Sequence, residues 1–402
     1  MKNVLFIVMD GLGDRPIKEF DGLTPLEAAK TPNLDRLTSH SICGQLYAIG
    51  AGIRPSSDVA HMSLFGLDYR HYYTGRGPIE LMGTNENMSD LDIAWRGNFC
   101  SLDKNGKITD RRIGRRTPPK ELLDSIKEIT IKDITFKIVH IAEHRFALKA
   151  TGDLLSSNIT DSDPHIENVF PYEVEPTDQS ESARFTSLVV NQYIHTISEK
   201  LSRSDVAMEM GINGILLRSV GVRPQWPSIS EMYGFHESCC IANNALYNGI
   251  ARNLGMKIHS YNHYSDYLDY YSAFPNAVMK ELESNQFVFL HIQEGDLFGE
   301  DGDFYGKKKA IEQIDIALSF LNEIDPDETL IVVTADHSTP CTLKAHSGDA
   351  VPLIISGSCV RKDIVSEFGE RSCAVGGLGM VLGKHLMQIV VNYMGNAKLI
   401  GG

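Results

Sequence analysis

Carboxylate and imidazole side chains follow three apolar segments of this sequence, each at the point where the segment ends. The apolar segments are residues 4–9, 287–292 and 332–335. Continuous apolar runs are typical of strands buried on both faces, and parallel sheets bind ligands at the carboxyl ends of such strands. We therefore expect a shared metal site rich in oxygen and nitrogen ligands, built from Asp10, Asp296, Glu300, Asp336, His337 and His346.

Ser57 is the candidate nucleophile. It lies at the predicted start of a helix over residues 57–64, after the stiff pair Arg54-Pro55. A metal ion lowers the pKa of a bound hydroxyl, and a helix N-terminus favours an alkoxide and phosphate oxygens. Local sequence alone favours the simpler interpretation that Ser57 or Ser56 is the N-cap of this helix. One serine can serve both purposes.

Each of the other candidate residues also has a simpler interpretation. Asp10-Gly11 is a common turn pair, the acidic run around Asp296 is typical of a solvated loop, and the two histidines could be ordinary core or surface residues. Their joint occurrence favours two sites of three or four ligands each. Two metals ~4 Å apart suit phosphoryl transfer, because they bind the attacking and leaving oxygens. Carboxylates with some imidazole indicate Mn²⁺, Zn²⁺ or Mg²⁺.

Basic residues are few and clustered. Four arginines lie within the six positions 111–116, and further candidates are Arg76, Arg96, His144-Arg145 and Arg218. Guanidinium groups bind phosphate and carboxylate in a planar, two-point geometry. The alternative is a solvated basic turn. This acidic chain has few other ways to hold a polyanion.

Composition excludes several functional classes. The chain has 402 residues, a hydrophobic content of 42%, a charged content of 22% and a formal charge of −14. This acidity disfavours general binding to nucleic acids or anionic membranes. The seven scattered cysteines include no Cys-x-x-Cys pair, which favours reduced thiols and a cytoplasmic protein. No apolar run reaches the ~18 residues of a membrane span.

The elements predict a two-domain α/β protein. Strands are expected near residues 4–9, 287–292, 329–335 and 352–356, with a helix over residues 307–322. Residues 24–29 and 31–37 each begin like capped helices. Between about residues 73 and 204 the pattern changes to half-exposed antiparallel strands. We therefore predict a discontinuous α/β domain of residues 1–72 and 205–402, with an inserted α+β lid of residues 73–204.

The sequence resembles a known family, the archaeal-type, cofactor-independent phosphoglycerate mutases of the alkaline phosphatase superfamily. The resemblance runs nearly from end to end. It is carried by residues 9–16, 24–29, 31–35, 54–61, 73–78, 110–112, 143–145, 161–165, 301–304, 334–340 and 346–349.

The resemblance implies a fold, a site and an activity. The fold is a mostly parallel sheet sandwiched by helices. One metal is held by residues matching Asp10, Ser57, Asp336 and His337, and the other by residues matching Asp296, Glu300 and His346. Ser57 would accept the phosphoryl group from 3-phosphoglycerate and return it to the 2-oxygen without bisphosphoglycerate. The lid would bind substrate through Arg112, His144, Arg145, Asp161 and Asp163.

The chain departs from the family pattern at two positions. Glu300 stands where family members usually carry histidine, and Gln293 where lysine is usual. A carboxylate is a harder ligand than imidazole, so the change shifts preference toward Mn²⁺ or Mg²⁺ and away from Zn²⁺. The added negative charge would weaken substrate binding.

The sequence therefore predicts a metal-dependent isomerase of glycolysis and gluconeogenesis, with two divalent ions, Mn²⁺ first and Zn²⁺, Mg²⁺ or Co²⁺ as substitutes. Its partner is a small phosphorylated metabolite, with no nucleic acid or membrane. One alternative is a phosphatase or a mutase for another small phosphorylated metabolite. Another is a catalytically weak relative with a regulatory role, which Glu300 and Gln293 motivate. The sequence makes no prediction of oligomeric state.

Overall fold

The chain folds into two compact units. The computed structural model describes residues 1–259 and 266–401. Unit 1 comprises Met1–Tyr72 and Trp226–Gly402, and unit 2 comprises Tyr73–Gln225. The second junction differs from the sequence prediction, which gave residues 205–225 to the metal domain. The reason is a strand at Gly214–Val222 (β8), which pairs antiparallel with Asp92–Leu102 (β3) of unit 2.

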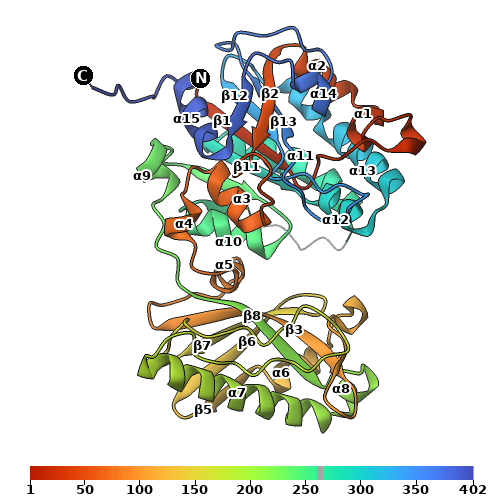
Figure 1. Cartoon of the computed structure of the whole chain (residues 1–402). Helices are drawn as coiled ribbons and strands as arrows, with labels where there is room; N and C mark the ends of the chain where they lie inside the picture. The colour runs from red at the N-terminus through yellow and green to blue at the C-terminus, as the bar shows by residue number, and fades with distance from the viewer. Residues whose placement is uncertain (260–265, 402) are drawn as a thin grey trace. The chain divides into compact units, whose positions relative to one another are not determined.

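Unit 1 is built on an eight-stranded sheet in the order β10-β9-β11-β1-β12-β13-β2-β14 (Figure 1). Only β13 runs against the others, so the predicted α/β fold with a mostly parallel sheet is confirmed. The strands are β1 (Asn3–Met9), β2 (Ser41–Tyr47), β9 (Ser238–Ile241), β10 (Lys257–Ile258), β11 (Phe287–Ile292), β12 (Thr329–Thr334), β13 (Val351–Ser356) and β14 (Gly379–Leu382).

Helices pack on this sheet in two groups. In one group α3 contacts both α10 and α15. In the other group α13 contacts α1, α2 and α11. The two groups lie on opposite faces of the sheet (Figure 1). The helices of unit 1 are η1 (Lys18–Phe20), α1 (Pro25–Ala28), α2 (Pro32–Thr38), α3 (Ser57–Leu64), α4 (Tyr69–Tyr72), α9 (Ile229–Tyr233), α10 (Ala245–Asn253), α11 (Tyr267–Leu282), α12 (Glu294–Asp301), α13 (Phe304–Ala317), η3 (Leu318–Glu323), α14 (Glu370–Cys373) and α15 (Gly383–Tyr393).

The apolar runs of the sequence form the centre of this sheet. Strand β1 lies between β11 and β12, and every side chain from Val4 to Val8 is fully buried. Burial on both faces explains why the sequence shows no alternation there. The predicted helix start at Thr24 is confirmed, since Thr24 and Glu27 form a reciprocal capping box.

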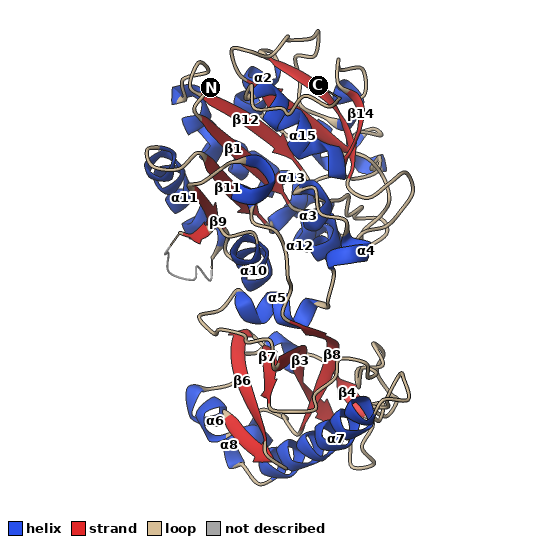
Figure 2. Ribbon diagram, turned by 90° about the vertical axis from the view of Figure 1, so that its left-hand side faces the viewer, coloured by secondary structure: helices blue, strands red, loops and turns tan. Residues whose placement is uncertain are grey.

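Unit 2 is an antiparallel sheet with helices (Figure 2). Its strands follow the order β4-β3-β7-β6-β5, with β8 on β3. The long helix α7 contacts β5 and β8, and its Tyr193 stacks on Phe136 in the main core. The elements are α5 (Arg76–Met82), β3 (Asp92–Leu102), β4 (Ile108–Asp110), η2 (Ile113–Arg115), α6 (Lys120–Ser125), β5 (Glu128–Ile131), β6 (Ile134–Ala142), β7 (Arg145–Thr151), α7 (Glu181–Ser202), α8 (Asp205–Glu209) and β8 (Gly214–Val222).

Candidate metal centre

Three neighbouring parallel strands deliver the acidic residues to one edge of the unit 1 sheet. Asp10 follows β1, Asp336 follows β12 by two residues, and Asp296 lies in the first turn of α12, just after β11. The pairing of Met9 with Ile292 and of Val8 with Thr334 brings these strand ends together. The sequence therefore located this edge correctly.

The first group of candidate ligands comprises Asp10, Asp336 and His337, all of them buried. The Nε2 atom of His337 lies 3.4 Å from Asp10 Oδ1 and 3.2 Å from Asp336 Oδ2. Ser57 Oγ lies 3.3 Å from the same nitrogen. One imidazole nitrogen thus faces two carboxylates and the candidate nucleophile.

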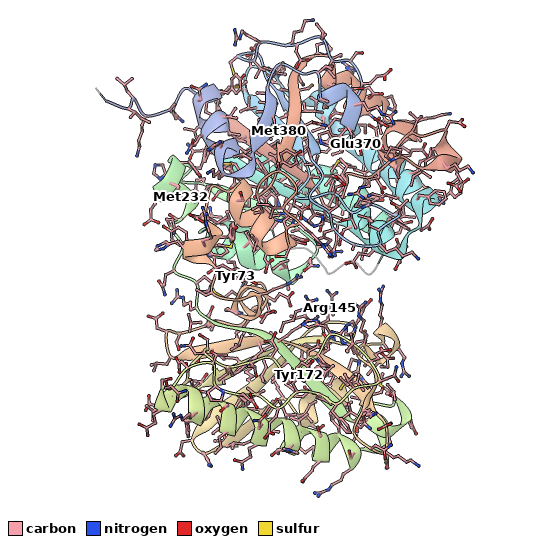
Figure 3. The ribbon with its side chains drawn as sticks, in the orientation of Figure 1. Tyr73, Arg145, Tyr172, Met232, Glu370 and Met380 are labelled. Carbon is pink, nitrogen blue, oxygen red and sulfur yellow. The ribbon has the colours of Figure 1, made fainter. Side chains whose placement is uncertain are left out.

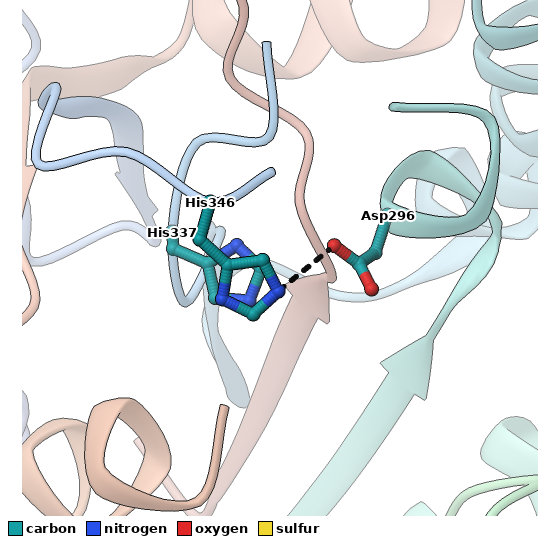
Figure 4. A group of neighbouring side chains, drawn as sticks. All are labelled: Asp296, His337 and His346. Atoms are coloured by element: carbon teal, nitrogen blue, oxygen red, sulfur yellow. Dashed lines mark ion pairs between the residues drawn. The ribbon is translucent and has the colours of Figure 1, made fainter. Parts of the chain in front are cut away.

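The second group comprises Asp296, His337 and His346 (Figure 4). His346 Nε2 lies 3.3 Å from Asp296 Oδ1, and its Nδ1 is 2.9 Å from the backbone carbonyl of Pro55. A carbonyl only accepts, so Nδ1 of His346 carries a proton and donates it. The two imidazole rings stack with their centroids 3.6 Å apart, which places the two groups side by side.

Charge repulsion in this edge calls for a cation. Burial, followed by the charge of Asp296, raises the pKa of Asp10, and burial, Asp10 and Asp296 raise the pKa of Asp336. Burial lowers the pKa of His337 to about 4 despite the opposing effect of Asp10, so this imidazole is neutral at pH 7. No positive side chain among these ligands offsets the carboxylates of Asp10 and Asp336.

Unpartnered oxygens support the same conclusion. Asp10 Oδ1 and Asp336 Oδ2 are buried, and neither has a hydrogen-bond partner within the part of the chain that the structure describes. A buried polar atom without a partner costs free energy that a bound ion recovers. Carboxylate and imidazole ligands suit Mn²⁺, Zn²⁺ or Mg²⁺, so the residues present fit a divalent cation.

Ser57 is not the N-cap of α3. The helix begins at Ser57, and Ser56 occupies the cap position without forming a side-chain capping bond. The hydroxyl of Ser57 instead points toward His337, as its contact with Nε2 shows. Of the two serines that the sequence offered for the cap, Ser56 therefore occupies it, and the hydroxyl of Ser57 is available at the candidate metal groups.

Glu300 belongs to neither of the two candidate ligand groups. The sequence placed Asp296 and Glu300 on a turn or acidic loop, but both belong to helix α12, which ends at Gly302 in the left-handed conformation. The Glu300 side chain is exposed, and neither candidate group found among the described residues includes it. Its role as a ligand stays a prediction.

Three buried aromatic residues beside the first group escaped the sequence analysis. Tyr247 donates a hydrogen bond to Asp10 Oδ2, and its ring stacks on His291 at 3.4 Å. His291 Nε2 lies 3.5 Å from Asp10 Oδ2, and His61 Nδ1 lies 3.5 Å from Asp336 Oδ2. His61 follows Ser57 by one helical turn, a spacing that could have revealed it. Tyr247 carries no sequence signal.

A second polar cluster lies within unit 2, around Arg145 and His144 (Figure 3 labels Arg145). Burial, then Arg145 and Arg112, lowers the pKa of the His144 imidazole to about 3. His144 Nδ1 and the Nε atoms of Arg96 and Arg145 are buried without hydrogen-bond partners in the described chain. Arg145 Nε is an unpartnered donor, and Arg96 Nε has the Glu80 carboxylate only at 3.6 Å, so the cluster favours an anion as its ligand.

The acidic residues of unit 2 differ in their surroundings. Asp163 is buried and pairs with Arg111 at 2.7 Å and with Arg218 at 3.0 Å. Asp161 accepts a bond from the backbone N–H of Ser219, and burial raises its pKa. Arg112 is exposed. All five predicted substrate residues thus belong to unit 2, while Asp163 is already neutralised by two guanidiniums.

Among the residues that the structure describes, none of the helices is both long and apolar enough to cross a bilayer.

Comparisons with known proteins identify relatives along nearly the whole chain. A model of the Metalloenzyme superfamily matches residues 2–393. The chain is 37% identical over 412 residues to a 2,3-bisphosphoglycerate-independent phosphoglycerate mutase of Methanosphaera stadtmanae, covering 100% of both chains. It is 36% identical over 410 residues to the corresponding mutase 1 of Methanocaldococcus jannaschii, covering 100% of this chain and 99% of the relative.

Two solved structures are similar along nearly the whole chain. A protein from Pyrococcus horikoshii aligns with a TM-score of 0.84 and 29% identity, covering 100% of this chain and 99% of that one. A cofactor-independent phosphoglycerate mutase from Thermoplasma acidophilum aligns with a TM-score of 0.69 and 33% identity, covering 98% of this chain and 100% of that one.

Proposed function

The chain belongs to the Metalloenzyme superfamily and to its 2,3-bisphosphoglycerate-independent phosphoglycerate mutases. From this premise we propose that it interconverts 3-phosphoglycerate and 2-phosphoglycerate, and that the reaction proceeds through a phosphoserine at Ser57. The observation that carries the proposal is the position of Ser57 Oγ, 3.3 Å from His337 Nε2, where the two candidate metal groups meet. The same nitrogen also faces the carboxylates of Asp10 and Asp336, so a nucleophile at this point lies beside one complete set of candidate ligands.

The proposed reaction has two balanced steps. Ser57 Oγ attacks phosphorus as its proton leaves, the bond from phosphorus to the 3-oxygen breaks, and a proton is delivered to that oxygen. The glycerate then presents its 2-hydroxyl, which loses a proton as it attacks the phosphoserine and regenerates the Ser57 hydroxyl. The second step reverses the first on a different oxygen, so no bisphosphoglycerate is consumed.

We assign one cation to Asp10, Ser57, Asp336 and His337 and the other to Asp296, His346 and the predicted ligand Glu300. Bound there, divalent ions lower the pKa of the serine hydroxyl and offset the charge of the phosphoryl oxygens. Mn²⁺ is the first candidate, because most of the ligands are carboxylates and no thiolate is among them. Zn²⁺, Mg²⁺ and Co²⁺ remain candidates for exchange experiments.

Unit 2 supplies the contacts to the glycerate in this proposal. Arg112, His144 and Arg145 bind the carboxylate, and the unpartnered nitrogens of His144 and Arg145 support this assignment. Asp161 is the better candidate for moving the hydroxyl protons, since its pKa is raised while Asp163 is held by Arg111 and Arg218. We retain Asp163 as the residue that orients these two arginines.

One observation favours a second candidate function, a catalytically weak relative with a regulatory role. Glu300 is exposed and outside both ligand groups, and Gln293 accepts a hydrogen bond from Asn244. Weak binding of the second metal would impair the return of the phosphoryl group and leave slow hydrolysis.

An enolase-coupled assay separates these functions. The proposal expects 2-phosphoglycerate to form from 3-phosphoglycerate with Mn²⁺ and without added bisphosphoglycerate. Release of inorganic phosphate from p-nitrophenyl phosphate without mutase turnover would indicate a phosphatase instead. Neither activity, with metal confirmed in the protein, would favour the regulatory relative.

A further inference from the structure

Thr339 lies between the two candidate metal groups. It is fully buried in the segment after β12, two residues beyond His337. Its hydroxyl contacts both groups, because Oγ1 is 2.7 Å from Asp296 Oδ1 and 3.0 Å from His337 Nδ1. No other hydroxyl among the described residues contacts both a carboxylate and an imidazole of these groups.

The hydroxyl of Thr339 can donate its proton to only one of its two partners. An ionised carboxylate only accepts hydrogen bonds, so Thr339 donates its single proton to Asp296. The oxygen then has lone pairs left for the imidazole, and Nδ1 of His337 must carry a proton to donate to them. The remaining nitrogen, Nε2, consequently keeps its lone pair, and this is the atom that faces Asp10, Asp336 and Ser57.

The backbone holds Thr339 in a fixed place. Its N–H donates to the carbonyl of Gly13 at 3.0 Å, and its own carbonyl accepts from Lys307 Nζ at 2.9 Å. Lys307 is fully buried and also bonds Gly13 O at 3.0 Å and Asp14 Oδ2 at 2.9 Å. Helix α12 packs closely on the same residue, since a Cβ added at Gly299 would lie 2.4 Å from the Thr339 carbonyl oxygen. The backbone of Thr339 therefore has little freedom to move, and the hydroxyl is held by its contacts with Asp296 and His337.

We propose that Thr339 is a positioning residue for the metal centre, whose hydroxyl fixes the tautomer of His337 and ties this imidazole to Asp296, so that both groups present metal-binding atoms at once. The inference rests on the proposed metal site and deepens it. Outer hydrogen-bond partners of this type orient metal-ligating histidines and set which nitrogen is free. Lys307 supports this arrangement indirectly, because it donates hydrogen bonds to the Thr339 carbonyl and to Gly13 and Asp14 in the loop that follows β1.

Three variants of the full-length protein separate this role from packing. Thr339→Val removes the hydroxyl at constant shape, and Thr339→Ser keeps it. Thr334→Val is the matched control, because Thr334 is also fully buried and its hydroxyl donates only to backbone carbonyls, at 3.0 Å to Pro352 O. A general effect of losing a buried hydroxyl would appear in both valine variants.

The first measurement is the affinity for Mn²⁺ alone, by titration calorimetry of protein stripped with EDTA. We expect Thr339→Val to bind Mn²⁺ about 10- to 100-fold more weakly, the usual effect of losing an outer partner. Thr339→Ser and Thr334→Val should stay close to the wild type. Equal affinities for the two valine variants would overturn the proposal.

The second measurement is ¹⁵N NMR of histidine-labelled, metal-free wild type, with the His337 signals assigned by their loss in His337→Gln. We expect the tautomer protonated at Nδ1, changing to a mixture in Thr339→Val. A wild-type His337 protonated at Nε2 would overturn the proposal, even if Thr339→Val failed to fold. Absence of Mn²⁺ binding by the wild type would refute the proposed metal function, whereas the tautomer would still decide the role of Thr339.

Discussion

Replacing Glu80 with glutamine should destabilise unit 2 strongly, because Glu80 is the buried counter-ion of an arginine cluster. Its Oε1 lies 2.7 Å from Arg76 Nε and 3.6 Å from Arg96 Nε, and its side chain is 5% exposed. Burial alone would raise the pKa of Glu80. The charges of Arg96 and Arg76 outweigh burial and lower the pKa to about 2.

The size of the effect follows from the difference between the ordinary pKa of 4.5 and the value of about 2 in the fold. At about 1.4 kcal/mol for each factor of ten, ionised Glu80 contributes about 3 kcal/mol to stability at pH 7. A depressed pKa stabilises the fold above 4.5, and this stabilisation is lost as pH falls from 4.5 through about 2. The difference between wild type and Glu80→Gln should therefore shrink over that window.

Tryptophan fluorescence can follow unit 2 alone. The chain has two tryptophans, Trp95 buried in unit 2 and Trp226 in unit 1. In a Trp226→Phe background, urea unfolding reported by Trp95 measures the stability of unit 2. The matched control is Glu86→Gln, since Glu86 also pairs with two basic residues but is partly exposed. Such a pair contributes at most about 1 kcal/mol.

The reasoning would be refuted if Glu80→Gln cost less than about 1 kcal/mol at pH 7, or as little as Glu86→Gln. A difference that stayed constant from pH 7 to pH 3 would also contradict it, because the effect would then come from packing and not from ionisation.

Three further predictions concern the metal centre and the substrate. Chelation with EDTA should abolish mutase turnover, and Mn²⁺ should restore it best. The two-metal site would be excluded if the protein kept full activity after elemental analysis had shown that it lacks metal. Arg112→Ala should strongly raise KM or lower kcat for 3-phosphoglycerate. It should spare hydrolysis of p-nitrophenyl phosphate, because a small aryl phosphate has no carboxylate to bind. Equal loss of the two activities would show that Arg112 contacts the phosphoryl group or is needed for folding. Glu300→His should raise the affinity for Zn²⁺ and Co²⁺ relative to Mn²⁺, since imidazole is the softer ligand. In calorimetry with each metal, an unchanged order of affinities, together with two bound metals in Glu300→Ala, would show that Glu300 binds neither ion.

The edge of the sheet that carries the candidate ligands was predictable because strand burial leaves a strong signal. Continuous apolar runs at residues 4–9 and 287–292 form adjacent parallel strands, and the polar residues after them meet at one edge. The imidazole of His346, by contrast, reaches this edge from a segment between β12 and β13. Its place was indicated only by its occurrence shortly after Asp336-His337 and by the family motif, not by a strand end.

Two errors have clear physical causes. Strand β8 is as apolar at its start as a strand of a parallel sheet, because its residues 214–217 are buried in unit 2, so the sequence assigned it to the wrong unit. Helix α12 carries Gly295 and Gly299, which resemble turn residues in the sequence. Glycine is required at these positions because the helix packs closely on neighbouring backbone, since a Cβ at Gly295 would lie 2.6 Å from the Asp10 carbonyl oxygen.

The roles of Tyr247 and Thr339 could not be predicted from sequence. Each acts through one hydroxyl that contacts a carboxylate far away along the chain, Tyr247 on Asp10 and Thr339 on Asp296. Such contacts depend on how the strand-end segments pack against each other, and neither residue type signals a metal site by itself.

The most direct test of the account is to look for phosphoserine during turnover. Metal-loaded wild type is mixed with 3-phosphoglycerate, quenched in acid within one turnover, digested and mapped by mass spectrometry, with Ser57→Ala as the control. The account predicts one phosphoryl group on the peptide containing Ser57, formed as fast as 2-phosphoglycerate appears, and no turnover in Ser57→Ala. Full mutase turnover without phosphorylated Ser57, or turnover that survives in Ser57→Ala, would contradict it.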